Sequence, residues 1–100
     1  MQKGGWVYLL TNKYHTVLYT GVTSDLIGRM LDHRGKTYPS SFTARYNVTK
    51  LVYFKLYDSI EDAIIEEKRI KGGNRAAKIH LVHAFNPLWK DLWAEEVSKW

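Results

Sequence analysis

The sequence predicts an α/β (α+β) protein in which a three-stranded antiparallel sheet is flanked by helices. Two short runs rich in β-branched and aromatic residues, 6–11 and 17–22, are separated by a short turn segment, which is typical of a hairpin. A third run of this kind spans 51–57, and helical apolar spacing occupies much of the remainder. A chain of 100 residues has room for one hydrophobic core, so we expect a single domain over 1–100.

The hairpin carries two tyrosines whose relative placement depends on the turn. If the connecting loop has an even number of residues, the pleat places Tyr8 and Tyr19 on the same face of the hairpin. An odd loop separates them. The loop therefore decides whether the two hydroxyls can share a site.

A helix is expected directly after the hairpin. Thr23-Ser24-Asp25 supplies N-cap chemistry, and the helix should run through Arg34 and stop at Gly35. Its buried stripe is predicted to consist of Leu26, Ile27, Met30 and Leu31. Polar side chains recur at three- and four-residue spacing on an adjacent flank, namely Asp25, Arg29, His33 and Lys36. We therefore expect Arg29 and His33 to be neighbours.

The middle of the chain predicts a short helix and then the third strand. Ser40-Ser41 can cap a helix over 42–46. The run 51–57 is apolar on both faces apart from Lys55, which suits a central strand covered on each side.

The next helix contains an acid at an apolar position. Ser59 with Asp62 forms an approximate capping box, and Gly72-Gly73 ends the helix. Glu67 shares the i, i+3, i+4, i+7 face of Ile60, Ala63 and Ile64, so its carboxylate should point inward. Such a group needs a cation or hydrogen-bond donors. It is either a metal ligand or catalytic group, or one partner of a salt bridge at the edge of the core.

The last third of the chain predicts two more helices. The first spans about 75–85, with Ile79, Val82 and His83 at core-like spacing. The second is an aromatic helix over 88–100, whose stripe consists of Trp89, Leu92, Trp93, Val97 and Trp100. We expect this stripe to pack on the domain, which favours a monomer, and the alternative is a surface for a protein partner or a second copy.

Composition narrows the class of protein. A net charge of +5 and a pI near 9.5 fit a polyanionic partner such as nucleic acid, although solubility alone also explains them. The absence of cysteine excludes disulfides and thiolate metal sites. No apolar run is long enough for a membrane span, and the segment 1–6 leads into a strand without a secretory signal. We therefore expect no membrane partner and a cytoplasmic location.

An ordered set of residues resembles a known nuclease family. Trp6-Val7-Tyr8 precedes Tyr19-Thr20-Gly21, after which come Arg29, His33 one turn later and the inward Glu67. In this order the residues resemble the GIY-YIG nuclease family. The segment 86–92 resembles the tail of its small stand-alone bacterial members, which are similar to the N-terminal domain of the excinuclease C subunit. The chain departs from the pattern at Trp6-Val7, at Thr20, and at Val22 where the excinuclease domain has lysine.

The resemblance implies hydrolysis of phosphodiester bonds with one divalent cation, Mg²⁺, for which Mn²⁺ can substitute. Glu67 would carry the cation, and water and phosphate oxygens would complete its shell. Tyr8 would activate the attacking water, while Tyr19 would orient that water or the phosphate. Arg29 would clamp the phosphate, and His33 could accept the proton. Gly21 would form the turn at the site, with Asn86 as a candidate accessory residue.

The expected function is thus a metal-dependent endonuclease acting on nucleic acid, with DNA as the expected substrate and repair or recombination as the setting. Four basic side chains could contact phosphates, although a solvated surface explains them equally well: Lys36, Lys71, Arg75 and Lys78. We do not assign His15, His80 or His83 as ligands. The chief alternative is a nucleic-acid binding module that is non-catalytic or depends on a partner for catalysis.

Overall fold

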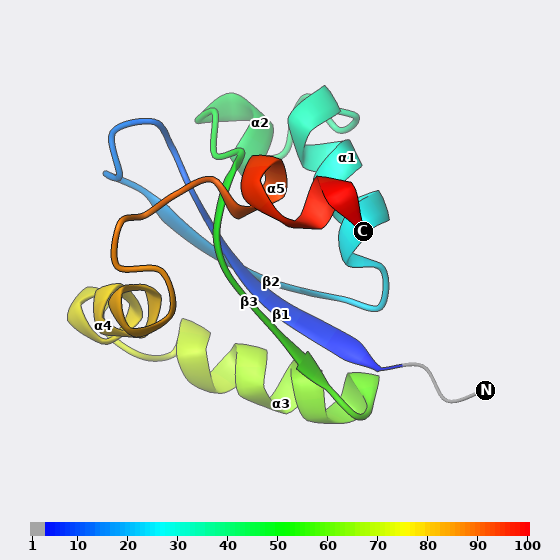
Figure 1. The fold of residues 1–100 in the computed structure, drawn as a ribbon, viewed down its shortest axis with the longest axis vertical. Helices are drawn as coiled ribbons and strands as arrows, with labels where there is room; N and C mark the ends of the chain where they lie inside the picture. Colours follow the sequence, from blue (N-terminus) through cyan, green and yellow to red (C-terminus); the bar gives the residue numbers. More distant parts are fainter. Residues whose placement is uncertain (1–3) are drawn as a thin grey trace.

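The computed structural model describes residues 4–100 and places a three-stranded antiparallel sheet between two layers of helices (Figure 1). In chain order its elements are β1 (Gly5–Thr11), β2 (Leu18–Thr23), α1 (Leu26–Gly35), α2 (Phe42–Arg45), β3 (Lys50–Tyr57), α3 (Ile60–Lys71), α4 (Arg75–Phe85), α5 (Leu92–Glu95) and the 3-10 helix η1 (Val97–Lys99). The predicted fold class is confirmed. The first residues of the segment in which we found no secretory signal, 1–3, lie outside the described residues.

The strand order is β2-β1-β3, with both pairs antiparallel. The prediction that the third strand is central was wrong, because β1 is central and β3 lies at an edge. The apolar character of β3 has another cause: α5 contacts it from one layer, and α3 and α4 contact it from the other (Figure 1). A covered edge strand and a central strand thus leave the same pattern in a sequence.

The hairpin register places both tyrosines on one face. Thr11 pairs with Leu18, so the connecting loop is the even stretch 12–17, and Leu10 pairs with Tyr19. Tyr8 and Leu10 point to the same side of β1, and therefore Tyr19 does too. The Asn12 side chain holds the turn, since its Oδ1 accepts hydrogen bonds from the backbone of Thr16 at 2.8 Å and of Val17 at 3.2 Å.

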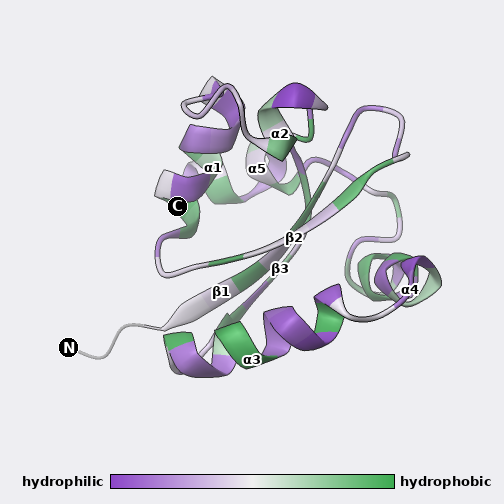
Figure 2. Cartoon of the chain, turned by 180° about the vertical axis from the view of Figure 1, so that it is seen from behind, coloured by the Kyte–Doolittle hydropathy of each residue, from purple (hydrophilic) through white to green (hydrophobic). Residues whose placement is uncertain are grey.

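Each face of the sheet carries its own apolar cluster. The cluster on the side of α1, α2 and α5 consists of Tyr8, Leu10, Leu26, Met30, Val48, Leu51, Phe54 and Val97. The cluster on the side of α3 and α4 consists of Val7, Leu9, Val52, Tyr53, Ala63, Ile70 and Val82. Figure 2 shows the hydrophilic and hydrophobic stretches that alternate along α3, as expected of a helix with one face on the sheet.

Three helical details differ from the sequence prediction. In α1 only Leu26 and Met30 are buried, whereas Ile27 and Leu31 are exposed, because the helix touches the sheet along a narrow stripe. The left-handed position at its end is Lys36 with a φ of 50°, one residue after Gly35. In α4 Val82 is fully buried, but His83 is exposed. The three predicted capping segments are confirmed, since Asp25, Ser41 and Ser59 each accept a backbone hydrogen bond as N-caps.

The predicted continuous aromatic helix over 88–100 was wrong. Trp89 adopts a left-handed conformation with a φ of 53°, and Asp91 caps the separate short helix α5 by accepting a hydrogen bond from the Trp93 backbone. The segment nevertheless packs on the sheet, because Val97 is fully buried and Trp100 contacts Trp6 at a centroid distance of 5.4 Å.

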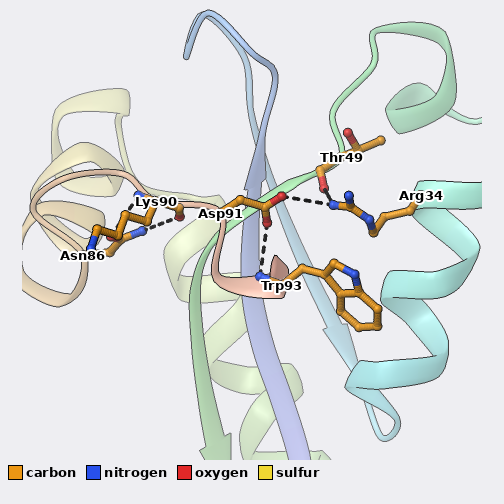
Figure 3. A network of polar contacts seen from close by, with 6 residues as sticks. All are labelled: Arg34, Thr49, Asn86, Lys90, Asp91 and Trp93. Carbon is orange, nitrogen blue, oxygen red and sulfur yellow. Dashed lines mark hydrogen bonds and ion pairs between the residues drawn. The ribbon is translucent and has the colours of Figure 1, made fainter. Parts of the chain in front are cut away.

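Two polar side chains, those of Arg34 and Asn86, fasten this segment to the rest of the fold (Figure 3). The Arg34 guanidinium donates to the Asp91 carboxylate at 3.1 Å and so joins α1 to the start of α5. Asn86 is buried, and its amide nitrogen donates to the carbonyl oxygens of Val52 and Lys90 while its oxygen accepts from the Lys90 backbone. Both amide hydrogens and the amide oxygen of Asn86 thus help to fix the chain path between α4 and α5.

Candidate active site

The site is built around a tyrosine that crosses the neighbouring strand. Tyr8 on β1 pairs with Gly21 on β2, and the two side-chain positions point to the same face. A Cβ atom at Gly21 would lie 2.3 Å from Cζ of the Tyr8 ring, so the ring occupies the space that any larger residue would need. Gly21 is therefore required for close approach, and the Tyr8 hydroxyl reaches over β2 toward α1.

A hydrogen-bonded chain starts at that hydroxyl. The Tyr8 oxygen lies 3.1 Å from Nε2 of His33, and Nδ1 of His33 lies 2.9 Å from Oγ1 of Thr43. Tyr19 flanks the pair, with its ring centroid 6.4 Å from that of Tyr8 and 5.9 Å from that of His33. Thr43 was missed by sequence reasoning, because the residues around it signal only the start of a short helix.

The surroundings of Tyr8 and His33 set the protonation states of these two side chains. Burial raises the pKa of Tyr8, the nearby Tyr19 and Glu67 act in the same direction, and the Arg29 charge opposes them. Burial, followed by the Arg29 charge, lowers the pKa of His33 below its ordinary value of 6.5. At neutral pH Tyr8 is therefore protonated and His33 is neutral. With the hydrogen on Nδ1, His33 accepts from Tyr8 and donates to Thr43.

A pocket of about 170 Å³ opens beside the hydrogen-bonded side chains, between α1, α2 and β2. Its lining residues are Tyr19, Arg29, Asp32, His33, Lys36, Tyr38, Ser41, Phe42, Thr43 and Ala44. The predicted neighbours Arg29 and His33 thus share one wall of the pocket with Lys36. Tyr8 lies behind His33 and is 1% exposed, so its hydroxyl communicates with the pocket through the hydrogen bond.

Glu67 comes from the opposite layer. It lies on the face of α3 that packs against β1 and β2, and only 8% of the residue is exposed. Its Oε2 is 3.1 Å from Nζ of Lys71, so the salt bridge that we considered from the sequence is present. The carboxylate also points inward as predicted, and its charge contributes to the raised pKa of Tyr8.

A second oxygen faces the same layer as Glu67. Thr20 pairs with Leu9, whose side chain belongs to the cluster under α3, so Thr20 points to that side. Within the described part of the chain its Oγ1 is buried without a hydrogen-bond partner. Among residues 4–100 no group of three or more His, Asp and Glu side chains gathers around one point. The donor set therefore fits a hard, largely hydrated cation on one carboxylate and does not fit zinc.

The structure does not bring the four candidate phosphate contacts together. Lys36 lies at the end of α1 beside the pocket, whereas the other three lie at the corner of α3 and α4 in the opposite layer. Each of those three has an intramolecular partner. Lys71 pairs with Glu67, Arg75 donates to the His15 carbonyl at 3.0 Å, and Lys78 donates to the Gly73 carbonyl at 2.7 Å. Asn86 likewise lies away from the pocket, and its amide group is hydrogen-bonded to backbone carbonyl oxygens.

Comparison with known protein families shows which family this chain belongs to. Residues 4–80 match the model of the GIY-YIG catalytic domain. The chain belongs to the GIY-YIG family. This GIY-YIG match includes both tyrosines, Arg29, His33 and Glu67, and it ends within α4.

Two relatives are similar to this GIY-YIG chain over most of its length. A UPF0213 protein of Syntrophus aciditrophicus (strain SB) is 32% identical over 77 residues, which cover 77% of this chain and 87% of the relative. The solution NMR structure of a UPF0213 protein from Bacillus halodurans superimposes with a TM-score of 0.56 at 26% identity, covering 88% of this chain and 92% of that one. The GIY-YIG domain is of nuclease type, and its nucleases generally use divalent metal ions. Across residues 4–100, every helix of the GIY-YIG chain is too short or too polar to cross a membrane.

Proposed function

We propose that this protein is an endonuclease that hydrolyses phosphodiester bonds in nucleic acid with Mg²⁺, or Mn²⁺ in its place, and that DNA is its substrate. The observation that supports this best is the hydrogen bond between the Tyr8 hydroxyl and Nε2 of His33 at a pocket lined by Arg29. The bond links the buried Tyr8 hydroxyl to His33, a group that lines the pocket and can store a proton. Arg29 supplies positive charge on the same wall.

The proton follows the hydrogen-bonded chain in this proposal. A protonated tyrosine is no base by itself at neutral pH, and burial makes its ionisation harder still. Tyr8 can instead accept the proton of the attacking water while it passes its own proton to Nε2 of His33, which requires the hydroxyl, buried in the resting protein, to become accessible from the pocket. Thr43 holds the imidazole ring in the required orientation through Nδ1. His33 is then the proton acceptor, and Tyr8 relays the proton.

Arg29 and Tyr19 act on the phosphate. The Arg29 guanidinium can donate two parallel hydrogen bonds to phosphate oxygens, and this neutralises charge that grows in the transition state. Tyr19 lines the pocket and orients the phosphate or the water. His33 is not itself charged in the resting state, so it does not compete with Arg29 for the anion.

Glu67 would hold the divalent cation, which when bound supplies positive charge to the phosphate and the leaving oxygen. Its carboxylate suits Mg²⁺, because this ion keeps several waters and needs only one or two protein carboxylates. In the resting protein Lys71 neutralises that carboxylate at 3.1 Å. The ammonium group competes with a cation for this carboxylate, and its departure would leave Lys71 free to face a phosphate.

The proposal is tested by cleavage of supercoiled plasmid, branched DNA and single-stranded DNA and RNA with Mg²⁺, Mn²⁺ or EDTA. Glu67→Gln and Arg29→Ala are each expected to lower the cleavage rate at least about 100-fold, as removal of one electrostatic contact does in other enzymes. Glu61→Gln is the matched control, because Glu61 is an exposed acid on the same helix. Cleavage that survives in EDTA or in Glu67→Gln would refute the assigned mechanism.

A binding module without cleavage is the alternative, and the Glu67–Lys71 pair favours it, because a lysine already satisfies the carboxylate. Gel-shift assays with the same substrates separate the two functions. Binding by the folded parent protein without cutting in either metal would favour the module. Metal-dependent cutting that is lost in Glu67→Gln would exclude it.

A further inference from the structure

A row of aromatic rings leads away from the pocket along α2. The Tyr19 ring lies parallel to that of Phe42, with centroids 6.4 Å apart and planes inclined by 22°, and Phe42 contacts Tyr46 at 4.8 Å. Phe42 is 49% exposed and Tyr46 is 50% exposed. We call these three residues the stacking row. It begins at the candidate active site and leaves large apolar ring surface in water, which folded proteins otherwise tend to bury.

Positive charges accompany the stacking row. Arg29 and Lys36 line the pocket at its start, and the Arg45 guanidinium lies over the Tyr46 ring, 5.9 Å from the centroid. Asp32 is the one acidic residue of the pocket wall. Exposed aromatic rings interspersed with cations bind single-stranded nucleic acid in other folds, because bases stack on the rings while cations neutralise the phosphates.

We propose that the stacking row binds the bases of an unpaired stretch of nucleic acid and delivers one of its phosphodiester bonds to the site. Inside a duplex the two faces of a base are covered by its neighbours, and only base edges are presented in the grooves. The faces of Phe42 and Tyr46 can therefore stack only on bases that have left a duplex or never formed one. The cleavage position in this proposal rests on the function proposed above, whereas the preference for unpaired bases does not.

The stacking contact is measured apart from catalysis. A fluorescein-labelled oligo-dT strand, its duplex with oligo-dA and an oligo-U strand are titrated with protein in EDTA, and fluorescence anisotropy gives each Kd. Phe42→Leu and Tyr46→Leu remove a ring face but keep an apolar side chain for packing. Tyr14→Leu is the matched control, because Tyr14 is a 75% exposed tyrosine beside Lys13 in the hairpin turn. Circular dichroism verifies that each variant is folded.

We expect the parent protein to bind oligo-dT more tightly than the duplex. Each leucine substitution should raise the Kd for oligo-dT about fivefold or more and the Kd for the duplex less than about twofold, given the usual contribution of one stacked base. Phe42→Trp, which keeps a ring face, should bind as the parent does. The oligo-U strand shows whether the unpaired partner is DNA alone or RNA as well.

Several results would overturn the stacking proposal. They are an equal loss of duplex and single-strand binding, an unchanged Kd in both leucine variants, or an equal effect of Tyr14→Leu. The nuclease proposal can fail separately. Ring-dependent binding of oligo-dT without any metal-dependent cleavage would refute catalysis and support stacking, whereas duplex cleavage that is indifferent to Phe42→Leu and Tyr46→Leu would do the reverse.

Discussion

The two faces of the sheet use the same strand for different purposes. On β1, Val7 and Leu9 point toward α3 and α4 into the apolar cluster on that side, while Tyr8 points toward α1 and hydrogen-bonds to His33. Both sides are buried at β1, and the α1 side adjoins the pocket that Arg29 and His33 line. In the proposed function, stability and chemistry are thus separated by one residue of register, and Glu67 acts from the side of α3 and α4.

Leu9→Ala should have the largest effect on stability and little effect on the site. Leu9 is fully buried in the apolar cluster on the side of α3 and α4, so its truncation should lower the free energy of unfolding by about 2–5 kcal/mol. Urea denaturation measures this loss. Leu31→Ala is the matched control, because Leu31 is 56% exposed. If the two variants lost similar stability, the assignment of the α3 side as the main support of β1 would be wrong.

Gly21→Ala should damage the α1 face more than the protein as a whole. The new Cβ would lie 2.3 Å from Tyr8 Cζ, and the forced shift should cost about 1–3 kcal/mol of unfolding free energy. The bond from Tyr8 to His33 would be displaced, so nuclease activity should fall further than stability does. Gly35→Ala serves as the control, since its nearest neighbour would be 3.8 Å away. Normal activity in Gly21→Ala would show that Tyr8 has no part in the reaction.

The α1 side should also make the stability of the protein depend on pH under mildly acidic conditions. The pKa of His33 is lower in the folded protein than its ordinary value of 6.5, so the unfolded chain binds the proton first as the pH falls. The stabilising contribution is present above pH 6.5 and is lost on acidification toward the folded pKa. His33→Gln should therefore flatten the stability profile below that pH. NMR titration of the His33 ring checks the direction, and a midpoint above 6.5 would contradict it.

Lys71→Ala should have the smallest effect on stability and the most specific effect on metal binding. Lys71 is 59% exposed in its side chain, so loss of its ion pair with Glu67 should change the free energy of unfolding by less than about 1 kcal/mol. Removal of the competing ammonium should tighten Mn²⁺ binding, measured by calorimetry, by up to about fivefold. Lys68→Ala is the control, because Lys68 is an exposed lysine on the same helix. Weaker Mn²⁺ binding in Lys71→Ala would argue against Glu67 as the ligand.

Most elements before residue 88 were predictable from the sequence, whereas the long-range placements were not. Caps at Asp25, Ser41 and Ser59 are local signals, and the structure confirms each of them. Whether the hairpin loop has an even or an odd number of residues could not be decided from the sequence. Val17 resembles a strand residue, but in the structure it belongs to the loop. The third strand was misplaced because helices cover both sides of an edge.

The candidate site shows the same division between local and distant information. Arg29 and His33 were expected to be neighbours because helical spacing is local, and both line the pocket. Thr43 was missed because its contact with His33 joins residues that only the folded chain brings together. The reason for Gly21 also depends on an aromatic ring from the neighbouring strand. The broken tail was not foreseen, since the left-handed backbone of Trp89 is unusual for a bulky residue.

The central position of β1 has a consequence for the order of events during synthesis. β1 can pair with β2 once both strands have been translated, but its other edge stays open until β3 follows. The face with Tyr8 waits longer still, because its apolar cluster includes Val97. A nascent chain therefore holds an unpaired strand edge for much of its translation, which is an opportunity for mispairing with another chain. Ribosome-bound intermediates of this protein are expected to need protection at β1.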